Sequence, residues 1–395
     1  MKKSFAIVIV CYNRIDGVKR LTQSLERVDF DGRNDIDLIF SIDNSGSNIV
    51  EKFAANYQWK NGKKIIRTFE KRQGLKKHIL QCGEYTNDYD ILVVLEDDIF
   101  VSDSMYHFAY SAAVYYWDDT SVAGISLYSF QKNWLKWLVR FEPQKTKYDT
   151  YFMRIAMSWG QVWTKPKWVA FKSWLLMNES FEKADDIPDV LNVWPETSWL
   201  KYHDLYCIRE NKYFVYPYVS ISTNYSDVGE HAQYSVTDHQ VELMYGKKDY
   251  LFPLNDDDAV CYDEFMEREG LGKYMGIDDN ELTVDLWGNK PKKYYKKYVL
   301  SIENLPFKQI ETYALALRPI ELSVIVGLKG SEIKLYDTSQ KSIKEGKTNA
   351  DFYRYRYSIR SNDYSTLLKF SLMLSKQFFF DIKRKLLKIL KRLVR

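Results

Sequence analysis

Short apolar runs alternate with amphipathic segments along the first 130 residues. The runs at 5–11, 37–42 and 91–95 are continuous, which is typical of strands buried on both faces of a parallel sheet. Residues 18–28 instead repeat apolar side chains at helical spacing. Further segments fit the same alternation, with strands expected at 64–67 and 122–127 and helices at 49–57, 75–82 and 105–117. The pattern predicts an α/β fold with a doubly wound, mostly parallel sheet.

The run at 91–95 leads directly into three carboxylates, Glu96, Asp97 and Asp98. Open α/β sheets bind ligands beyond the carboxyl ends of their strands, so these acids would lie at a ligand-binding edge. Three crowded carboxylates repel one another and need a counter-charge, which a divalent metal would supply. The alternative is a solvated acidic turn after a core strand.

Polar residues also follow the two earlier strands. Asn13 and Arg14 come after the first, and Asp43 comes after the second. If these strands are parallel neighbours, all these side chains meet the acidic triplet at one edge. An acid there can accept hydrogen bonds from a base or a ribose, and an acidic cluster can hold Mg²⁺ or Mn²⁺ against a diphosphate. Neither a Walker sequence nor Gly-x-Gly-x-x-Gly is present, which argues against a kinase or a dehydrogenase.

Residues beyond 130 give a less regular pattern. The aromatic stretch 130–160 suits a loop or lid that faces an acceptor, and a helix is expected from Pro166. A helix is also expected after the polar and aromatic segment 199–204, and residues 213–221 read as a strand. Pro217 would place that strand at a sheet edge, because proline lacks the N–H of a ladder bond.

The size and composition indicate a folded protein with more than one unit. The chain has 395 residues, of which 46% are hydrophobic, and this is enough to form a sizeable core. Aromatic residues make up 16%, which can serve sugar or base stacking or simply fill the core. We expect a first domain over 1–240, an extension of unknown role over 241–365 and a basic helix over 366–395.

The basic helix at 366–395 dominates the charge of the chain. It contains nine Lys or Arg residues and the single acid Asp381, a net charge of +8, which leaves −4 for residues 1–365. Apolar residues recur in it at helical spacing, so it is expected to lie on an anionic membrane surface. The alternative is packing on the protein's own core or in a dimer. The acidic body argues against a nucleic-acid partner.

The cysteine spacing and the N-terminal residues indicate in which cellular compartment the protein is expected. The four cysteines contain no Cys-x-x-Cys pair, so the sequence supports neither a zinc site nor a disulfide framework. The apolar run after Met1 is short and is read as the first strand rather than a signal peptide. No apolar segment has the length of a bilayer span. We expect a cytoplasmic protein, peripheral on the inner face of the cell membrane.

Four motifs together resemble a known family. They are 7–14 (Ile-Val-Ile-Val-Cys-Tyr-Asn-Arg), 41–44 (Ser-Ile-Asp-Asn), 73–78 (Gln-Gly-Leu-Lys-Lys-His) and 95–98 (Leu-Glu-Asp-Asp). In order and spacing they resemble the nucleotide-sugar half of inverting GT-A glycosyltransferases, most closely bacterial family 2-type enzymes related to N-acetylglucosaminyltransferase I. The resemblance covers roughly residues 5–235 and extends to Trp159-Gly160, to 199–204 and to His231.

The resemblance implies roles on the donor side of a site. Asn13, Arg14 and Asp43 would help to seat the nucleotide, and His78 would lie near the base or phosphates. Asp98 would bind Mn²⁺ or Mg²⁺ directly, with Glu96 and Asp97 contacting sugar or ribose, and His231 would add a phosphate contact. On residue pattern alone, His78 could equally lie on the polar face of a helix, and His231 could be a surface loop residue.

The catalytic general base is less well defined, because the family often places an aspartate directly after a tryptophan. Here Leu200 follows Trp199. Asp204 is the first choice for the carboxylate that deprotonates the acceptor hydroxyl, and Glu196 is the second.

The expected function is therefore a metal-dependent hexosyl- or N-acetylhexosaminyltransferase. It would move a sugar from a nucleotide-sugar donor, expected to be UDP-linked, to a glycan or lipid-linked acceptor in surface polysaccharide synthesis. A sugar nucleotidyltransferase is an alternative, although the Gly-rich, basic signature of such enzymes is missing near the first strand. A membrane-bound, non-catalytic glycan-binding module is another.

Overall fold

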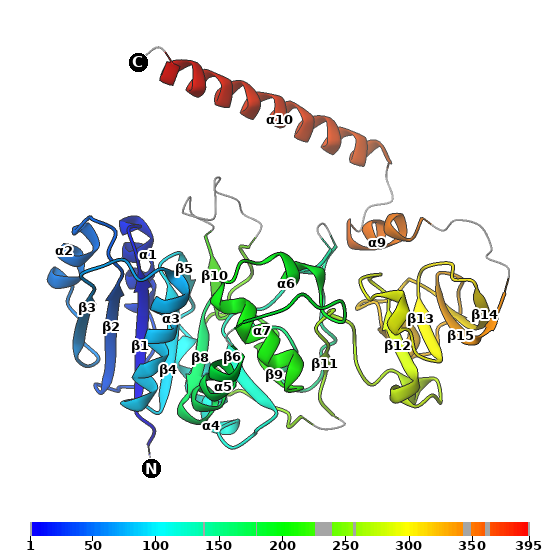
Figure 1. Ribbon diagram of the computed structural model, residues 1–395, viewed down its shortest axis with the longest axis horizontal. Helices are drawn as coiled ribbons and strands as arrows, with labels where there is room; N and C mark the ends of the chain where they lie inside the picture. Colours follow the sequence, from blue (N-terminus) through cyan, green and yellow to red (C-terminus); the bar gives the residue numbers. More distant parts are fainter. Residues whose placement is uncertain are drawn as a thin grey trace.

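The computed structural model describes residues 2–136, 139–178, 180–225, 239–255, 258–342, 349–359 and 364–393. A nine-stranded sheet forms the larger unit, and a four-stranded sheet forms a smaller unit beside it (Figure 1). The larger unit confirms the predicted α/β fold with a mostly parallel sheet.

The strand order of the large sheet is β11-β7-β9-β6-β8-β4-β1-β2-β3. Strands β3, β2, β1 and β4 are parallel neighbours, as the sequence predicted. The bounds are β1 Phe5–Cys11, β2 Ile36–Ile42, β3 Lys64–Thr68, β4 Ile91–Glu96, β6 Val122–Ser126, β7 Thr150–Met153, β8 Gln161–Thr164, β9 Tyr213–Pro217 and β11 Cys261–Tyr262.

Helices cover both faces of this sheet, which explains the continuous apolar runs. Alternate residues of β1 enter opposite cores, with Phe5 and Ile7 on one face and Ala6 and Val8 on the other. The first face is covered by α1 Ile15–Leu25, α2 Ile49–Asn56 and α4 Met105–Tyr115. The second is covered by α3 Leu75–Gly83, α5 Lys165–Met177, α6 Asp189–Val193 and α7 Trp199–Arg209.

Two strands depart from the sequence prediction. Strand β8 lies between β4 and β6 and is antiparallel to both, although only a helix was expected in this region. Strand β9 lies between β6 and β7, so the edge position predicted from Pro217 is wrong. Pro217 is the last residue of β9, and its missing N–H falls where the strand ends.

The smaller unit follows β11, whose residues lie beyond the expected division at 240. Its sheet has the order β12-β13-β15-β14, with helices α8 and α9 beside it and the long helix α10 after it. The bounds are β12 Leu282–Asp285, β13 Tyr298–Ser301, β14 Phe307–Tyr313, β15 Ile333–Lys341, α8 Leu322–Ile325, α9 Ala350–Ile359 and α10 Tyr364–Leu393. Short 3₁₀ helices occupy Glu84–Asn87, Gly272–Tyr274, Asp279–Glu281 and Lys292–Tyr294.

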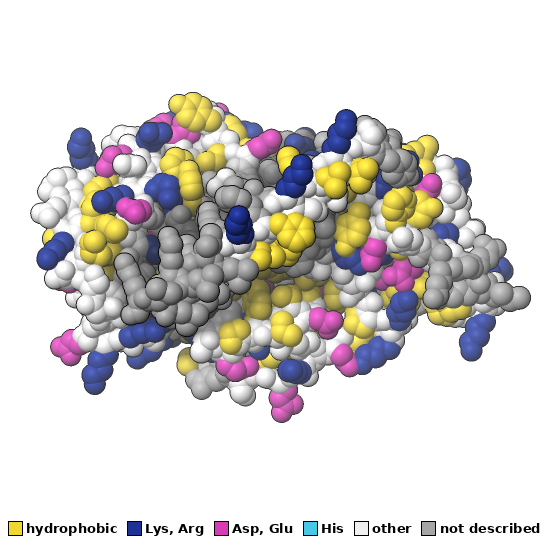
Figure 2. Space-filling view, turned by 90° about the horizontal axis from the view of Figure 1, so that it is seen from above, with side chains coloured by type: hydrophobic (Ala, Val, Ile, Leu, Met, Phe, Trp, Pro, Cys, Tyr) yellow, Lys and Arg dark blue, Asp and Glu magenta, His cyan; other side chains and the backbone are white. Residues whose placement is uncertain are grey.

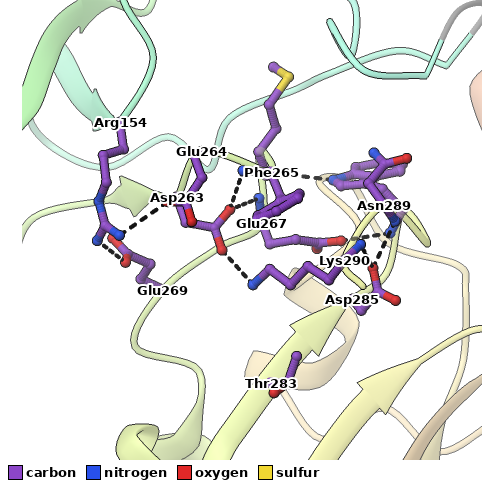
Figure 3. A network of polar contacts seen from close by, with 12 residues as sticks. Arg154, Asp263, Glu264, Phe265, Glu267, Glu269, Thr283, Asp285, Asn289 and Lys290 are labelled. Carbon is purple, nitrogen blue, oxygen red and sulfur yellow. Dashed lines mark hydrogen bonds and ion pairs between the residues drawn. The ribbon is translucent and has the colours of Figure 1, made fainter. Parts of the chain in front are cut away.

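A buried polar network joins the two sheets (Figure 3). Lys290 Nζ lies 2.5 Å from Asp263 Oδ2, and Glu267 accepts a 2.7 Å hydrogen bond from the backbone N–H of Trp287. On the side of the large sheet, Arg154 pairs with Glu264 and Glu269. The segment after β11 is thus tied both to β7 and to the four-stranded sheet.

Candidate functional site

The carboxyl ends of β1, β2 and β4 open on one edge of the large sheet. The register pairs Cys11 with Ile42 and Val10 with Glu96, so the loops after these three strands are neighbours. This edge lies at the top of Figure 1 and faces the viewer in Figure 2. A short ribbon of β5 Ile99–Val101 and β10 Ser222–Asn224 continues from the acidic triplet.

Arg14 lies at the centre of the acidic triplet. Its Nη1 is 3.0 Å from Asp98 Oδ2, and its Nη2 forms an ion pair with Asp97 Oδ1. Asp97 is buried and also accepts a long 3.4 Å hydrogen bond from the backbone N–H of Tyr12. Asp98 Oδ1 is buried without a hydrogen-bond partner among the described residues. The structure therefore brings together residues that are more than eighty positions apart in the sequence.

Close backbone packing sets this arrangement. Gly17, in the first turn of α1, lies so near the acidic loop that a Cβ there would be 2.3 Å from the Asp97 carbonyl oxygen. A backbone atom cannot move aside as a side chain can, so a residue larger than glycine would displace the loop. This close contact fixes the distance between the start of α1 and the acidic triplet, so that Arg14 can pair with Asp97 and Asp98.

The acidic triplet carries more negative charge than Arg14 balances. Burial, followed by repulsion from Asp98, raises the pKa of Glu96 to about 8. Burial also raises the pKa of Asp97 to about 6, although Arg14 opposes this rise. Because one guanidinium faces three carboxylates, the triplet favours a further positive charge.

These residues fit a divalent metal ion, although the site is not arranged as a finished ligand set. Within the described ranges, no group of three or more His, Cys, Asp or Glu side chains stands in a metal-binding arrangement. The buried, unpartnered Asp98 Oδ1 nevertheless offers a hard oxygen ligand, and the excess of carboxylate offers the charge that Mg²⁺ or Mn²⁺ prefers.

Asp43 organises the loop that precedes α3. Its Oδ1 accepts hydrogen bonds from the backbone N–H groups of Asn44 (2.8 Å) and Gln73 (2.7 Å). Its Oδ2 accepts one from Gly74 (3.0 Å), which adopts a positive φ of 79°. Both oxygens already have protein partners, so the carboxylate has little remaining capacity for a nucleotide. Asn13, by contrast, is exposed in the loop after β1.

His78 lies behind this loop rather than on its surface. It is buried, and its Nε2 is 2.7 Å from Ser41 Oγ. Burial lowers the pKa of His78 to about 4, so the ring is neutral at physiological pH. The expected contact with the base or phosphates does not fit this position. His231 lies outside the described residues.

The two candidate bases lie on or beside α7 in different surroundings. Asp204 is buried, and its Oδ1 accepts a 2.6 Å hydrogen bond from the backbone N–H of Ala156. Burial raises the pKa of Asp204 well above its usual range, which disfavours the ionised form. A buried carboxyl that already accepts a backbone N–H is poorly placed to meet an acceptor hydroxyl, so the structure does not favour Asp204 as the general base.

Glu196 is exposed just before α7 begins. Its backbone carbonyl accepts a 3.0 Å hydrogen bond from Lys76 Nζ, which belongs to the first turn of α3. A hydrogen bond from the Tyr202 hydroxyl is the main reason that the pKa of Glu196 is lowered. Glu196 is thus an ionised carboxylate beside α3, at the same edge as the Asp43 loop.

Sequence reasoning missed a set of three half-buried tryptophans, Trp134, Trp159 and Trp194. Trp134 contacts Trp159 (ring centroids 5.9 Å apart) and Trp194 (6.5 Å). Ser158, the residue before Trp159, forms a side-chain hydrogen bond with Glu96. Trp194 precedes Glu196 by two residues, so these three residues, the tryptophan wall, extend from the acidic triplet toward Glu196. The sequence signals were the Trp159-Gly160 pair of the resemblance and the aromatic content of 130–160, and neither indicated that the three rings lie together.

Comparison with known proteins gives one family match. Residues 6–165 match the family described as Glycosyl transferase family 2. The matched range contains Arg14, Asp43 and the acidic triplet, and it ends where β8 ends. No curated protein sequence matches the chain.

Solved structures with a similar arrangement are distant in sequence. The mannosyltransferase PcManGT from Pyrobaculum calidifontis, in complex with GDP-Man and Mn²⁺, is 10% identical with a TM-score of 0.36, over 55% of each chain. S. aureus TarS 1–349, in complex with UDP-GlcNAc, is 15% identical with a TM-score of 0.36, over 58% of this chain and 60% of that one. GalNAc-T7 with UDP, GalNAc and Mn²⁺ is 12% identical with a TM-score of 0.38, over 55% and 42%. The chain spans about half the length of the solved chains it matches, and no residue role is transferred from them.

Proposed function

We propose that the chain is an inverting, metal-dependent hexosyl- or N-acetylhexosaminyltransferase, and the match of residues 6–165 to the family described as Glycosyl transferase family 2 supports this proposal. The donor is a nucleotide-sugar, UDP-linked in our proposal, and the acceptor is a hydroxyl of a glycan or lipid-linked oligosaccharide in surface polysaccharide synthesis. The observation that carries the proposal is the cluster of Glu96, Asp97, Asp98 and Arg14 at the carboxyl edge of the sheet.

The donor side of the site would use this cluster. Asp98, through Oδ1, and Glu96 would hold Mn²⁺ or Mg²⁺, and Asp97 would keep Arg14 in position. A bound divalent ion would neutralise the charge that develops on the departing diphosphate. Asp43 would act indirectly, by fixing the 73–74 turn beside the donor, and exposed Asn13 would reach the nucleotide from the loop after β1.

Glu196 is the proposed general base. Strands β9, β6 and β4 run in the same direction. Helix α7 leads into the start of β9, so the opposite end of α7, which Glu196 precedes, lies at the carboxyl edge of the sheet. Asp204 lies five residues further along α7 than Trp199, about 7.5 Å deeper along the helix axis. An exposed, ionised carboxylate can take the proton of an acceptor hydroxyl as the oxygen attacks the anomeric carbon.

The tryptophan wall supports a sugar as the acceptor. Its members contact one another, remain half-buried rather than fully enclosed, and extend from Glu96 toward Glu196. Aromatic rings offer a broad apolar face with few rotatable bonds, which suits the apolar face of a pyranose. A sugar on this wall would have its hydroxyls between the metal-binding carboxylates and the base.

Transfer assays on the purified chain test this function. UDP- and GDP-linked hexoses and N-acetylhexosamines would be supplied with and without Mn²⁺, and nucleotide release would be measured. We expect metal-dependent release with at least one donor, and its loss in Asp98→Asn. Asp118→Asn is the matched control, because Asp118 is exposed and lies outside the site. Release that does not change in Asp98→Asn would reject the proposed metal site.

Helix α10 supports a membrane-associated acceptor. It spans 30 residues and carries exposed apolar side chains, including Leu368, Leu372 and Phe379. Within the described ranges, no helix combines the length and apolar character needed to cross a bilayer. In Figure 1 the helix lies over the carboxyl edge of the sheet. We propose that it lies in the headgroup region of an anionic membrane, on the cytoplasmic side, where the four free thiols would stay reduced.

Co-sedimentation with vesicles tests the role of α10. The full chain should bind vesicles that contain an anionic lipid and should bind zwitterionic vesicles weakly, because its basic residues interact with the negative surface potential. A chain ending at Ser365 should lose this binding and keep its transfer to a soluble acceptor. Equal binding by both chains would reject the membrane role.

A further inference from the structure

Arg14 places a positive charge among the carboxylates that would bind a metal ion. Its two terminal nitrogens engage two different carboxylates, Asp97 and Asp98. The Arg14 guanidinium therefore balances part of the negative charge of the acidic triplet.

The two oxygens of Asp98 differ in a way that bears on metal binding. Oδ2 is engaged by Arg14, whereas Oδ1 is buried and without a partner in the described part of the chain. A divalent ion on Oδ1 would share this carboxylate with a guanidinium cation. Repulsion between the two positive charges opposes binding of the ion while Arg14 stays in place.

Arg14 also has access to a second kind of partner. Its side chain is 25% exposed and lies at the edge where the loops after β1 and β4 meet. A guanidinium pairs with phosphate as readily as with carboxylate, because its planar fork of N–H donors matches either group. A diphosphate at this edge could take over the guanidinium without leaving it unpaired.

We propose that Arg14 is an internal counter-cation that keeps divalent-metal affinity low until a nucleoside diphosphate draws its guanidinium away from Asp97 and Asp98. The inference rests on the proposed function and adds to it that the metal ion and the diphosphate bind in a coupled way. Metal and diphosphate would bind poorly alone and strengthen each other. By linkage, the factor by which the diphosphate tightens the metal equals the factor by which the metal tightens the diphosphate.

Direct Mn²⁺ binding tests the proposal without any turnover. The free Mn²⁺ signal in electron paramagnetic resonance would be titrated with the full chain, in the presence and absence of UDP. In the absence of UDP, Arg14→Gln should bind Mn²⁺ at least about tenfold more tightly than the wild type, because a positive charge is removed beside the ion. UDP should tighten Mn²⁺ in the wild type by a larger factor than in Arg14→Gln.

Three further variants separate the effect of the Arg14 charge from other effects of substitution. Arg14→Lys keeps the positive charge and should retain weak Mn²⁺ binding. Arg27→Gln is the matched control, because Arg27 is exposed after the C-terminal end of α1, and it should bind Mn²⁺ as the wild type does. Arg14→Met is a second neutral variant that must give the same sign as Arg14→Gln if either folds poorly. Equal or weaker Mn²⁺ binding in the folded neutral variants would overturn the proposal.

Asp98→Asn distinguishes this inference from the proposed function. If Asp98→Asn abolishes Mn²⁺ binding whether position 14 is Arg or Gln, the metal site stands and the Arg14 variants test the counter-cation alone. If Mn²⁺ binding survives Asp98→Asn in both backgrounds, the metal lies elsewhere and the proposed donor site is wrong.

Discussion

Lys290 Nζ lies 2.5 Å from Asp263 Oδ2, and this ion pair joins the four-stranded sheet to the segment that follows β11 (Figure 3). The Asp263 side chain is 9% exposed and that of Lys290 is 18% exposed, so both charges are largely removed from water. The pair and its neighbours give the two units a shared polar core.

Removal of Lys290 should destabilise the protein. Lys290→Met leaves Asp263 buried without its cation, and a loss of about 3 kcal/mol in the free energy of unfolding is expected. Lys292→Met is the control, because its pair with Glu303 is exposed and should contribute less than about 1 kcal/mol. Urea unfolding monitored by tryptophan fluorescence measures both. Similar losses in the two variants would contradict a structural role for the Lys290 pair.

His78 should make the fold sensitive to mild acid. Burial lowers the pKa of His78 from 6.5 to about 4, so below pH 6.5 the unfolded chain binds a proton that the folded chain does not. Stability is therefore fully present above pH 6.5 and is lost as the pH falls toward 4, by up to about 3 kcal/mol for this group.

The His78→Gln variant checks this pH dependence. Glutamine has no titration in this range and can still hydrogen-bond Ser41. We expect urea midpoints measured from pH 7 to pH 4.5 to fall less steeply in the variant than in the wild type. Part of the slope should remain, because burial also lowers the pKa of His203, to about 3. Identical slopes would show that His78 is protonated in the folded protein.

The two candidate bases should respond differently to amide substitution. Glu196→Gln removes a carboxylate that can accept the acceptor proton, and kcat for transfer should fall by about 10² to 10⁴. Asp204→Asn replaces a buried carboxyl with a group of similar shape that still accepts the Ala156 N–H, so kcat should stay within about threefold. Single-turnover transfer assays compare them. A large loss in Asp204→Asn alone would reverse the assignment.

Trp134 should govern acceptor affinity rather than donor affinity. Trp134→Ala removes the central ring of the tryptophan wall, and KM for the acceptor should rise about tenfold while KM for the donor stays near the wild-type value. Trp134→Phe keeps an aromatic face and should recover most of the loss. An equal rise in both KM values, or no recovery with phenylalanine, would indicate a packing role alone.

Local patterns were sufficient to predict that Arg14, Asp43 and the acidic triplet follow strands at one edge of the sheet. The run from Ile91 to Leu95 identifies a strand buried on both faces, and the acids after it follow the strand in sequence, so their place at its carboxyl end is set by chain connectivity. The same reasoning applies to Arg14 after β1 and to Asp43 after β2. Periodicity also identified α1, because one face of that helix packs on the sheet.

The surroundings of His78 and of the two candidate bases could not be predicted in this way. The patterns around Trp159 and Trp199 do not reveal that β8 is antiparallel to β4, that His78 is buried behind Asp43, or that Asp204 lies in the core while Glu196 is exposed. Each of these facts depends on which distant segments pack together.

The sequence by itself thus determined the α/β architecture and the edge on which the acids gather, because both follow from local periodicity and from the direction of the chain. Only the tertiary structure decided which carboxylate keeps its charge and where the tryptophans meet. The physical reason is that burial and charge pairing are set by long-range packing. That packing places Arg14 on Asp97 and Asp98 and encloses Asp204 beside Ala156.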